Sequence, residues 1–342
     1  MKRPWFRHVA APMVGQSDLP FRLTAVQYGA TATWTCVAAD RQMFHTRDID
    51  DRDTRETLVR ALEIGRAAPE ARDIDTGERT PQIVQLAGDC PDALVRAARA
   101  VPGADGFDIN LGCPQKRARD GHYGGYLLAR REWPLVEQLG ACMLTVAALA
   151  QSVDVPVCAK IRLCDTARET PELAKRVAHA GADIVTLHAR HVAPNRRRGG
   201  AAKLEYVAAV VDTLEAAGLH ASRGGRTHVI TNGGVRGYED VARNMALTRA
   251  DGAMVGEPLL GAPDIFRACG DALAPLVTYL DNCVAYGVDA PHVCVQQHAR
   301  SMVAARLAPG RETRALADAL AAAPTASAMR LCLSLPPRGD HT

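Results

Sequence analysis

The sequence predicts an α/β protein, a (β/α)8 TIM barrel followed by a small C-terminal helical domain. Short β-branched apolar runs alternate with longer segments of helical spacing, eight such runs occur before Phe266, and none follows it. Alternation of this kind is typical of parallel βα units, and eight of them in roughly 250 residues are the size of a closed barrel. A doubly wound sheet of five or six strands would leave runs unused.

The predicted strands are residues 8–13, 31–39, 82–87, 107–111, 155–162, 184–189, 228–232 and 253–255. Each precedes a segment with helical spacing, such as residues 91–101 and 170–180. The densely charged residues 47–80 predict a solvated loop and a surface helix without chemistry. Because active-site residues of such barrels follow the C-terminal ends of the strands, we expect functional side chains just after each run.

The domain boundaries follow from the same pattern. Residues 1–270 are predicted to form the barrel, residues 271–335 a helical domain, and residues 336–342 a polar, disordered tail. No stretch reaches about 18 uninterrupted apolar residues, and the basic N-terminal segment leads into an apolar run too short for a signal sequence. We therefore expect a cytoplasmic protein without a membrane anchor. We also expect this protein to be a monomer.

Composition excludes little but directs attention to clusters. The chain has 342 residues, 47% of them hydrophobic and 23% charged, and a net charge of +3, which permits a polyanionic partner without requiring one. Its 10 cysteines show neither Cys-x-x-Cys nor metal-ligand spacing, so we expect mostly buried thiols, a reducing compartment and no metal site.

The most informative stretch is residues 106–128, where an apolar run ends at Asn110, Gly112, Cys113 and Pro114. A thiol at a strand end is predicted to be either reactive or a packed core residue. The neighbouring glycines and the closely following Lys116 favour an open setting. A cysteine that protonates carbon must be a thiol close to a carbanion.

The first predicted strand ends in a segment with two interpretations. The backbone of Pro12, Met13 and Val14 could line a flat ligand at the mouth of the barrel. Alternatively this is a plain βα turn, in which Ser17 or Asp18 caps the next helix.

Three later strands end in polar side chains that suit a flavin. The amide of Gln85 can donate to and accept from the edge of a heteroaromatic ring, although it could also anchor a loop. Lys160 ends a mostly apolar strand, where a cation is costly unless it is paired internally or binds an anionic ligand such as the N1/O2 edge of a reduced flavin. His188 takes the same place one strand later, as a ligand or as a satisfied core histidine.

Glycines follow the last two predicted strands. Asn232, Gly233 and Gly234 end the seventh, and Gly256 and Glu257 follow the eighth. Glycines allow backbone N–H groups to approach a phosphate, and TIM barrels often hold a phosphate in these two loops. Together with the predicted ring contacts, this favours flavin mononucleotide (FMN) as the cofactor.

With these residues assembled, the chain resembles the tRNA-dihydrouridine synthases, flavin enzymes with a barrel and a C-terminal helical domain. The resemblance runs from Ala11 to about residue 333, and its most specific part is Asn-Leu-Gly-Cys-Pro-Gln at 110–115 with Gly-His-Tyr-Gly-Gly-Tyr-Leu at 121–127. This part is similar to the eukaryotic-type branch that acts on positions 16 and 17 of the tRNA D-loop.

The resemblance implies residue roles and a mechanism. NADPH, or NADH, would reduce FMN, N5 would deliver hydride to C6 of a uracil turned out of its stack, and Cys113 would protonate C5. Tyr123 or Tyr126 would either stack on that base or pack in the core. Substrate contacts would fall on Asn110, Lys116 and Arg190. Flavin contacts would fall on Pro12, Met13, Val14, Gln85, Lys160, His188, Asn232, Gly233, Gly234, Gly256 and Glu257.

Two positions and one segment depart from the family pattern. Glu257 stands where many members carry Arg, and a carboxylate cannot donate to phosphate. Ala189 replaces a glycine, and its methyl group could crowd the ring. Residues 196–200 also differ, in the loop on the substrate side.

A tRNA partner requires cations along a path. The clusters after predicted strand ends, and two arginines of the helical domain, either form this path or are ordinary solvated surface. They are Lys116, Arg117 and Arg119, then Arg130 and Arg131, then Arg196, Arg197 and Arg198, then Arg300 and Arg306.

Two other functions stay open. An FMN barrel oxidoreductase acting on a free small molecule would share the cofactor residues but would need neither the helical domain nor the cations. A catalytically lapsed RNA-binding protein is the second alternative, indicated by Glu257 and Ala189.

Overall fold

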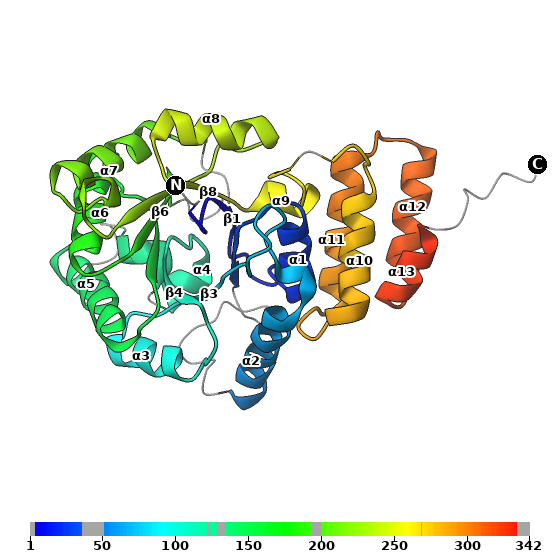
Figure 1. The fold of residues 1–342 in the computed structure, drawn as a ribbon, viewed down its shortest axis with the longest axis horizontal. Coiled ribbons are helices and arrows are strands. Elements are labelled where there is room, and N and C mark those ends of the chain that lie inside the picture. The colour runs from blue at the N-terminus through cyan, green and yellow to red at the C-terminus, as the bar shows by residue number, and fades with distance from the viewer. Residues whose placement is uncertain are drawn as a thin grey trace, which may run out of the picture.

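The computed structural model describes residues 4–35, 51–121, 123–128, 135–192, 200–267 and 269–333, and of residues 117, 128 and 135–142 the backbone alone. Eight parallel strands pair in chain order, and β8 pairs with β1, so the sheet is a closed barrel (Figure 1). The predicted (β/α)8 fold is confirmed. The strands are β1 (His8–Ala10), β2 (Ala32–Thr35), β3 (Gln82–Leu86), β4 (Gly106–Leu111), β5 (Val157–Leu163), β6 (Ile184–His191), β7 (His228–Asn232) and β8 (Gly252–Val255).

Helices follow the strands around the barrel, and further helices continue the chain. The surface helix predicted within residues 47–80 is confirmed as α2, which buries Leu58, Ala61 and Leu62 on one face. Residues 36–39 of the second predicted strand lie outside the described residues. The helices are α1 (Leu19–Gln27), α2 (Arg52–Ala67), α3 (Pro91–Arg99), α4 (Lys116–Asp120), α5 (Leu135–Ser152), α6 (Thr170–His179), α7 (Glu205–Ala216), α8 (Tyr238–Thr248), α9 (Glu257–Gly261), α10 (Ala274–Tyr286), α11 (His292–Arg306), α12 (Arg311–Ala322) and α13 (Ala326–Cys332), with 3₁₀ turns at η1 (Pro69–Ala71), η2 (Gly124–Leu128), η3 (Ala167–Glu169) and η4 (Ala221–Arg223).

At the amino-terminal end of the barrel one contact recurs in four places. The residue immediately before each even-numbered strand accepts, through its side chain, from a backbone N–H at the start of the preceding odd-numbered strand, at 2.8 to 3.0 Å. Its own N–H donates to the carbonyl of the same residue at 2.7 to 3.0 Å. Each strand pair is therefore locked in register where it begins. The acceptors are Thr31, Asp105, Asp183 and Asp251, and their donors are His8, Gln82, Val157 and Val229.

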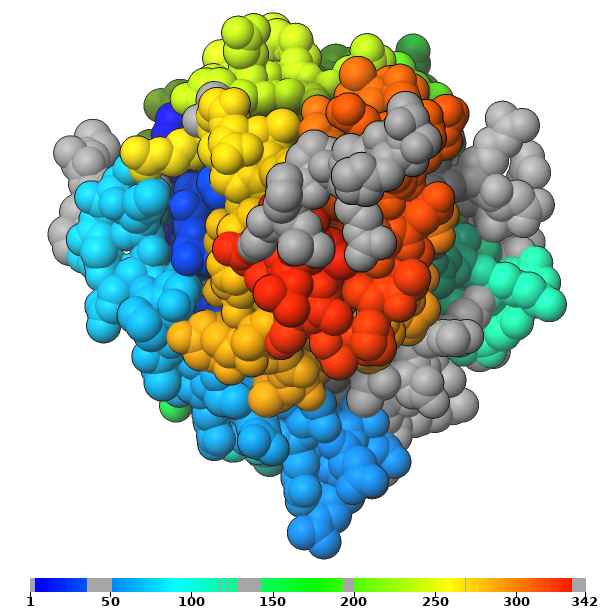
Figure 2. Space-filling view, turned by 90° about the vertical axis from the view of Figure 1, so that its right-hand side faces the viewer, coloured from blue at the N-terminus to red at the C-terminus, as the bar shows by residue number. Residues whose placement is uncertain are grey.

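The C-terminal helices predicted from residue 271 onward are confirmed, and they share a hydrophobic core with the barrel. Helix α10 packs against α1, and α11 packs against α9. One cluster of buried side chains contains Phe21 and Leu259 from the barrel with Leu276, Tyr279 and Met302 from the helices. Figure 2 looks onto this face, where α10 to α13, orange to red, cover one side of the barrel.

Buried polar contacts fix this junction. Asp18 caps α1 by accepting from Phe21 N–H at 2.8 Å, which confirms one of the two predicted caps, and it also lies 3.3 Å from His298 of α11. Arg306 donates through both terminal nitrogens to Asp264, at 2.5 and 2.9 Å. Because Asp264 engages its guanidinium, Arg306 is a poor candidate for a nucleic-acid contact.

The part of the chain that the structure describes lacks two features of other protein classes. No helix there combines the length and the apolar character needed to cross a bilayer. No group of three or more His, Cys, Asp or Glu side chains is arranged there to hold a metal ion.

Candidate active site

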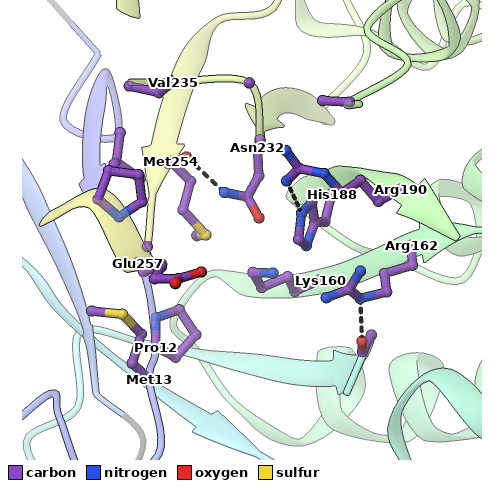
Figure 3. A pocket seen from close by; sticks show the side chains of 18 of the residues that line it. Pro12, Met13, Lys160, Arg162, His188, Arg190, Asn232, Val235, Met254 and Glu257 are labelled. Atoms are coloured by element: carbon purple, nitrogen blue, oxygen red, sulfur yellow. Dashed lines mark hydrogen bonds between the residues drawn. The ribbon is translucent and has the colours of Figure 1, made fainter. Parts of the chain in front are cut away.

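A cavity of about 1000 Å³ opens at the carboxyl-terminal end of the barrel (Figure 3). Its volume is at the upper end of the range for cofactor and ligand sites. Every predicted site residue except Lys116 lines it: Pro12, Met13, Val14, Gln85, Asn110, Cys113, Lys160, His188, Arg190, Asn232, Gly233, Gly234, Gly256 and Glu257. Lys116 begins α4 and is exposed outside the cavity.

Strand register explains the convergence of residues distant in sequence. Arg162 of β5 pairs with His188 of β6, His188 with Asn232 of β7, and Asn232 with Met254 of β8. These four residues therefore form one row around the barrel, with Lys160 two residues deeper on β5. Alternate residues of a strand face the same side, so the row and Lys160 all line the cavity.

The loop after β1 forms one wall of the cavity. The N–H of Met13 donates to the Ser17 hydroxyl at 2.7 Å, and the same hydroxyl donates to the Ala11 carbonyl at 3.3 Å. Ser17 thus shapes this turn, and Asp18 caps the helix. The two interpretations of the segment, a cavity wall at residues 12–14 and a plain βα turn, therefore occur together. Asn232 of β7 donates to the Met254 carbonyl at 2.7 Å, which orients its amide at the opposite wall (Figure 3).

Cys113 follows β4 and reaches the cavity with its side chain 9% exposed. Two glycines of the turn after α4 press against it. A Cβ on Gly124 would lie 2.8 Å from the Cβ of Cys113, and Gly125 N–H donates to the Cys113 carbonyl at 2.9 Å. Gly124 also has φ of +71°, a conformation that favours glycine. The Gly-Gly pair therefore shapes the support of the cysteine.

The two tyrosines beside these glycines pack behind the cysteine. Tyr123 and Tyr126 are 2% and 4% exposed and cluster with Cys113. The Tyr126 hydroxyl donates to the Pro114 carbonyl at 3.0 Å. Neither ring lines the cavity, so the structure supports the packing alternative over base stacking.

A hydrogen-bonded series leads from the barrel interior to the cysteine. Gln85 Nε2 donates to Asp108 Oδ2 at 2.6 Å, and Asn110 Nδ2 donates to Gln85 Oε1 at 2.8 Å. Asn110 Oδ1 accepts from the N–H groups of Gly112 and Cys113 at 3.1 and 3.0 Å. The predicted role of Gln85 as a loop anchor is thus compatible with its place in the cavity wall.

Two cations of β5 lie in the floor of the cavity. Burial lowers the pKa of Lys160, and the nearby Arg162 lowers it further. Among the described residues, none makes a hydrogen bond or a contact ion pair with the Lys160 ammonium, but the Asp108 carboxylate on the neighbouring strand attracts it and opposes the fall of its pKa, so the predicted internal pairing is present only as this longer-range attraction. Arg162 donates through Nε to the Gly112 carbonyl at 2.6 Å, and burial lowers its pKa to about 10, which leaves it charged at neutral pH.

His188 is neutral, and its tautomer is determined by a neighbour. Burial lowers its pKa well below the ordinary value, and Arg162, Lys160 and Arg190 lower it further. Arg190 Nη1 lies 3.0 Å from His188 Nε2 (Figure 3). Because a guanidinium can only donate, Nε2 accepts and the ring proton is on Nδ1. His188 can therefore donate a hydrogen bond through Nδ1–H but carries no positive charge.

The loop after β7 closes one end of the cavity. Gly233 and Gly234 have φ of +105° and +73°. A Cβ on Gly233 would lie 3.2 Å from His188 Cδ2 and 3.3 Å from Arg190 Nη1. Glycine at position 233 thus permits a close approach of the backbone to the charged side of the cavity.

Helix α8 adds charge to the same end. Asp240 accepts from Arg236 N–H at 2.6 Å and pairs with the Arg243 guanidinium at 2.6 Å. Arg236 lines the cavity, and no described residue makes a hydrogen bond or an ion pair with its guanidinium. Asp240 therefore orders the turn and engages Arg243, while Arg236 retains its bonding capacity.

The structure places the departures from the family pattern in different surroundings. Glu257 is exposed and lines the cavity as the first residue of α9. Ala189 is fully buried in the core outside the strands, because residues alternate along β6 and His188 takes the inward position. The expectation that the Ala189 methyl group crowds a ring is wrong. His122, Arg130, Arg131, residues 196–199 and 336–342, and the side chain of Arg117 lie outside the described part.

Sequence reasoning missed Arg162, Asp108 and Arg236 as parts of the site. Arg162 follows Lys160 by two residues and Asp108 precedes Asn110 by two, so strand periodicity could have found both. Arg236 follows the glycines after β7, and only its contact with the cavity identifies it.

A parallel barrel with a deep cavity at the carboxyl ends of its strands, glycine loops after β7 and β8 and a cationic floor belongs to the cofactor-binding class of TIM barrels. Within that class, the chain belongs to the dihydrouridine synthase (Dus) family, which it matches over residues 9–323.

Three relatives within the family are 30 to 32% identical to this chain over the aligned residues. The NAD(P)(+)-linked tRNA-dihydrouridine(16/17) synthase of Schizosaccharomyces pombe is 30% identical over 277 residues, 81% of this chain and 61% of that protein. Its Saccharomyces cerevisiae counterpart is 31% identical over 76% of this chain and 54% of that protein. The Mus musculus protein named tRNA-dihydrouridine(16/17) synthase-like is 32% identical over 80% of this chain and 51% of that protein. The chain thus spans little more than half the length of these relatives.

Among solved structures, a 2-naphthoyl-CoA reductase aligns with a TM-score of 0.53 at 13% identity, over 82% of this chain and 50% of that one. This similarity concerns the barrel fold.

Proposed function

We propose that this chain reduces uridine to 5,6-dihydrouridine in the D-loop of tRNA, at positions 16 and 17, with a bound flavin and with NADPH or NADH as the reductant. The observation that carries the proposal is the meeting of Cys113, Lys160 and His188 at one cavity, in a chain of the Dus family. The specificity for positions 16 and 17 is supported by the names of the yeast and mouse relatives.

The residues present fit a flavin. Lys160 is a half-buried cation that no described residue bonds directly, and the neighbouring Asp108 compensates only part of its burial, so a ligand with negative charge would stabilise it. The amides of Gln85 and Asn232 lie on the cavity wall and can bond the N–H and C=O groups of a heteroaromatic ring. The turn at residues 12–14 would lie against the ring.

FMN is the finer proposal, because one end of the cavity suits a phosphate. Gly233 and Gly234 leave their backbone accessible at the loop after β7, one of the two loops that hold phosphates in TIM barrels. Arg236 adds a cation at this end. Glu257, at the β8 end, would contribute backbone contacts only.

A reduced flavin would supply the hydride that C6 of the uracil receives. The chain's own residues orient and protonate. Cys113 holds a proton on Sγ for C5, and Asn110 holds the backbone N–H of this cysteine in place. Lys160 and Arg162 keep the floor of the cavity positive, which stabilises a bound anionic group. His188, kept neutral, donates through Nδ1–H.

The tRNA contacts are proposed for the rim of the cavity and the C-terminal helices. A uridine must leave its stack to reach Cys113. Lys116 on α4 is exposed beside the loop that carries the cysteine. On the helical side Arg300 is exposed, whereas Arg306 is bonded to Asp264. Such phosphate contacts would weaken as salt concentration rises.

The test uses tRNA from cells that lack dihydrouridine, incubated with the purified chain, FMN and NADPH. Mass spectrometry of its fragments is expected to detect dihydrouridine at positions 16 and 17. Cys113→Ala should lower the rate by about 10²- to 10⁴-fold, the usual contribution of a general acid, and leave flavin absorbance and tRNA binding unchanged. Cys90→Ala, which alters an exposed thiol, is the matched control and should retain the rate.

Other outcomes would contradict parts of the proposal. Full activity of Cys113→Ala would exclude the cysteine as the proton donor. Reduction of a free pyrimidine or an enone without dihydrouridine in tRNA would favour a small-molecule oxidoreductase. A chain that binds tRNA but takes up no flavin would favour an RNA-binding protein without catalysis.

A further inference from the structure

The polar groups beneath Cys113 form a series of hydrogen bonds in which every donor points away from Cys113 and toward Asp108. The links are Gln85 to Asp108 at 2.6 Å, Asn110 to Gln85 at 2.8 Å, and Cys113 N–H to Asn110 at 3.0 Å, each written from donor to acceptor. Asp108 is 0% exposed, Gln85 2% and Asn110 7%. Asp108 is closed off from solvent, and Gln85 and Asn110 expose little of their surface to the cavity, so each donor depends strongly on its protein acceptor.

The direction of the series is dictated from the cysteine end. The backbone N–H groups of Gly112 and Cys113 can only donate, so Asn110 must turn its oxygen toward them. Its nitrogen then faces Gln85, which must present oxygen to Asn110 and nitrogen to the next group. The group at the far end must therefore accept.

A carboxylate meets this requirement, and Asp108 occupies the position. Strand register makes the arrangement possible, since Gln85 pairs with Asp108 between β3 and β4, and Asn110 pairs with Lys160 between β4 and β5. Lys160 thus brings a positive charge to the strand beside the buried carboxylate. Burial raises the pKa of Asp108, while Gln85 and Lys160 oppose this rise.

We propose that Asp108 is a positioning residue: it determines the orientation of the Gln85 and Asn110 amides and thereby holds the backbone of Cys113, and so its thiol, at the cavity. The arrangement itself needs no flavin or tRNA. Its consequence for protonation of a uracil rests on the proposed function.

The proposal predicts that the direction of the series can be reversed. In Asp108→Asn, either a buried amide nitrogen is left without an acceptor or Gln85 turns and points its nitrogen at Asn110. In Asn110→Asp, an oxygen of the new carboxylate faces Gln85 Oε1. In the double variant, position 108 donates to Gln85 Oε1, Gln85 Nε2 donates to position 110, and the N–H groups of Gly112 and Cys113 keep their acceptor.

The experiment measures the rate at which iodoacetamide alkylates Cys113 in the purified full chain, resolved by peptide mass spectrometry. The exposed Cys90 is the internal reference. Each single variant is expected to raise the rate at Cys113 relative to Cys90 by about fivefold or more, and the double variant to return it to within about twofold of the original chain, a strong coupling between neighbouring sites. The thermal unfolding midpoint should follow the same order.

Asp183→Asn is the matched control, because Asp183 also accepts from a backbone N–H but lies at the opposite end of the barrel. This variant should lower the thermal unfolding midpoint without changing the alkylation rate of Cys113 relative to that of Cys90. A rise of this rate ratio equal to that in the Asp108 and Asn110 variants would overturn the proposal, because it would show a general loosening of the fold. Additive effects in the double variant would also overturn it. If single variants fail to fold, a folded double variant supports the proposal and an unfolded one overturns it. A chain without dihydrouridine synthase activity leaves this test unaffected.

Discussion

The two ends of the barrel treat polar groups in opposite ways. At the amino-terminal end, Asp251 accepts from Val229 N–H at 2.9 Å and lies 3.1 Å from His220, and equivalent contacts recur around the ring. At the carboxyl-terminal end, Lys160 and Arg236 have no hydrogen bond or contact ion pair within the described residues. The amino-terminal end uses its polar groups for stability, whereas the carboxyl-terminal end, beside its internal hydrogen bonds, keeps these two cations available for a ligand, as the fold generally divides these tasks.

Two carboxylates express this difference as pKa shifts of opposite sign. Burial acts to raise the pKa of both. At Asp251 the hydrogen bond from Val229 N–H and the adjacent imidazoles of His220 and His228 outweigh burial and lower the pKa below its usual range. At Asp108 burial outweighs Gln85 and Lys160, and the pKa rises. An aspartate carboxylate therefore stabilises the fold at the amino-terminal end of the barrel, whereas at the carboxyl-terminal end burial destabilises its charged form.

The largest expected effect concerns the crowded turn at Cys113. Gly124→Ala places a Cβ 2.8 Å from that of Cys113 at φ of +71°, so we expect a loss of about 2 to 4 kcal/mol in the free energy of unfolding from overpacking and backbone strain. Urea unfolding measures this, and peptide-resolved alkylation of Cys113 should increase.

Gly77 provides the control for backbone strain alone. It has φ of +70°, and a Cβ added there would meet nothing within 4 Å. Gly77→Ala should cost only about 1 kcal/mol, the usual effect of a positive φ. Equal losses in the two variants would show that contact with Cys113 contributes nothing.

An intermediate effect is expected at the end of the cavity proposed to bind the FMN phosphate. Arg236→Ala should weaken binding of FMN by about 10-fold, as loss of one charge-assisted hydrogen bond does, and leave riboflavin binding unchanged. Titration of the flavin-free chain, followed by flavin fluorescence, measures both affinities. Arg223→Ala, an exposed arginine at the other end of the barrel, is the control. A parallel loss of riboflavin would assign Arg236 to the ring or to folding instead.

The smallest effect concerns acid stability at the amino-terminal end. Because the folded pKa of Asp251 lies below the unfolded value of about 3.9, the unfolded chain binds its proton first as pH falls. The stability that this group contributes is complete above about pH 5 and is lost as pH falls through the unfolded and then the folded value. Asp251→Asn should lower stability at pH 7 by about 1 to 3 kcal/mol and make it less dependent on acid.

Urea unfolding at neutral and acid pH checks this, and dihydrouridine formation at pH 7 by the folded variant should match that of the original chain. An unchanged acid dependence would show that other carboxylates carry it.

Much of the architecture could be predicted because its signals are local. Short apolar runs locate all eight strands, and β7 has the predicted bounds of His228–Asn232. Strand ends marked by Gly233 and Gly234, or by Cys113, are equally visible, since glycines and polar residues that end an apolar run need no distant partner to be recognised.

Contacts between strands could not be predicted in this way. The bond from Arg162 to the Gly112 carbonyl joins residues 50 positions apart, and the bond from Asn110 to Gln85 joins residues 25 positions apart. Neither follows from spacing along one segment, because each depends on which strands become neighbours and in which register.

The sequence by itself therefore determined the eight βα units, the helical C-terminal part and the polar residues that follow the strands, since periodicity and turn chemistry are properties of single segments. Only the tertiary structure decided which of those residues face one another, which described cations make no hydrogen bond or contact ion pair, and which amide supports Cys113. Closure of the barrel makes these decisions, because it fixes register and burial for all strands at once.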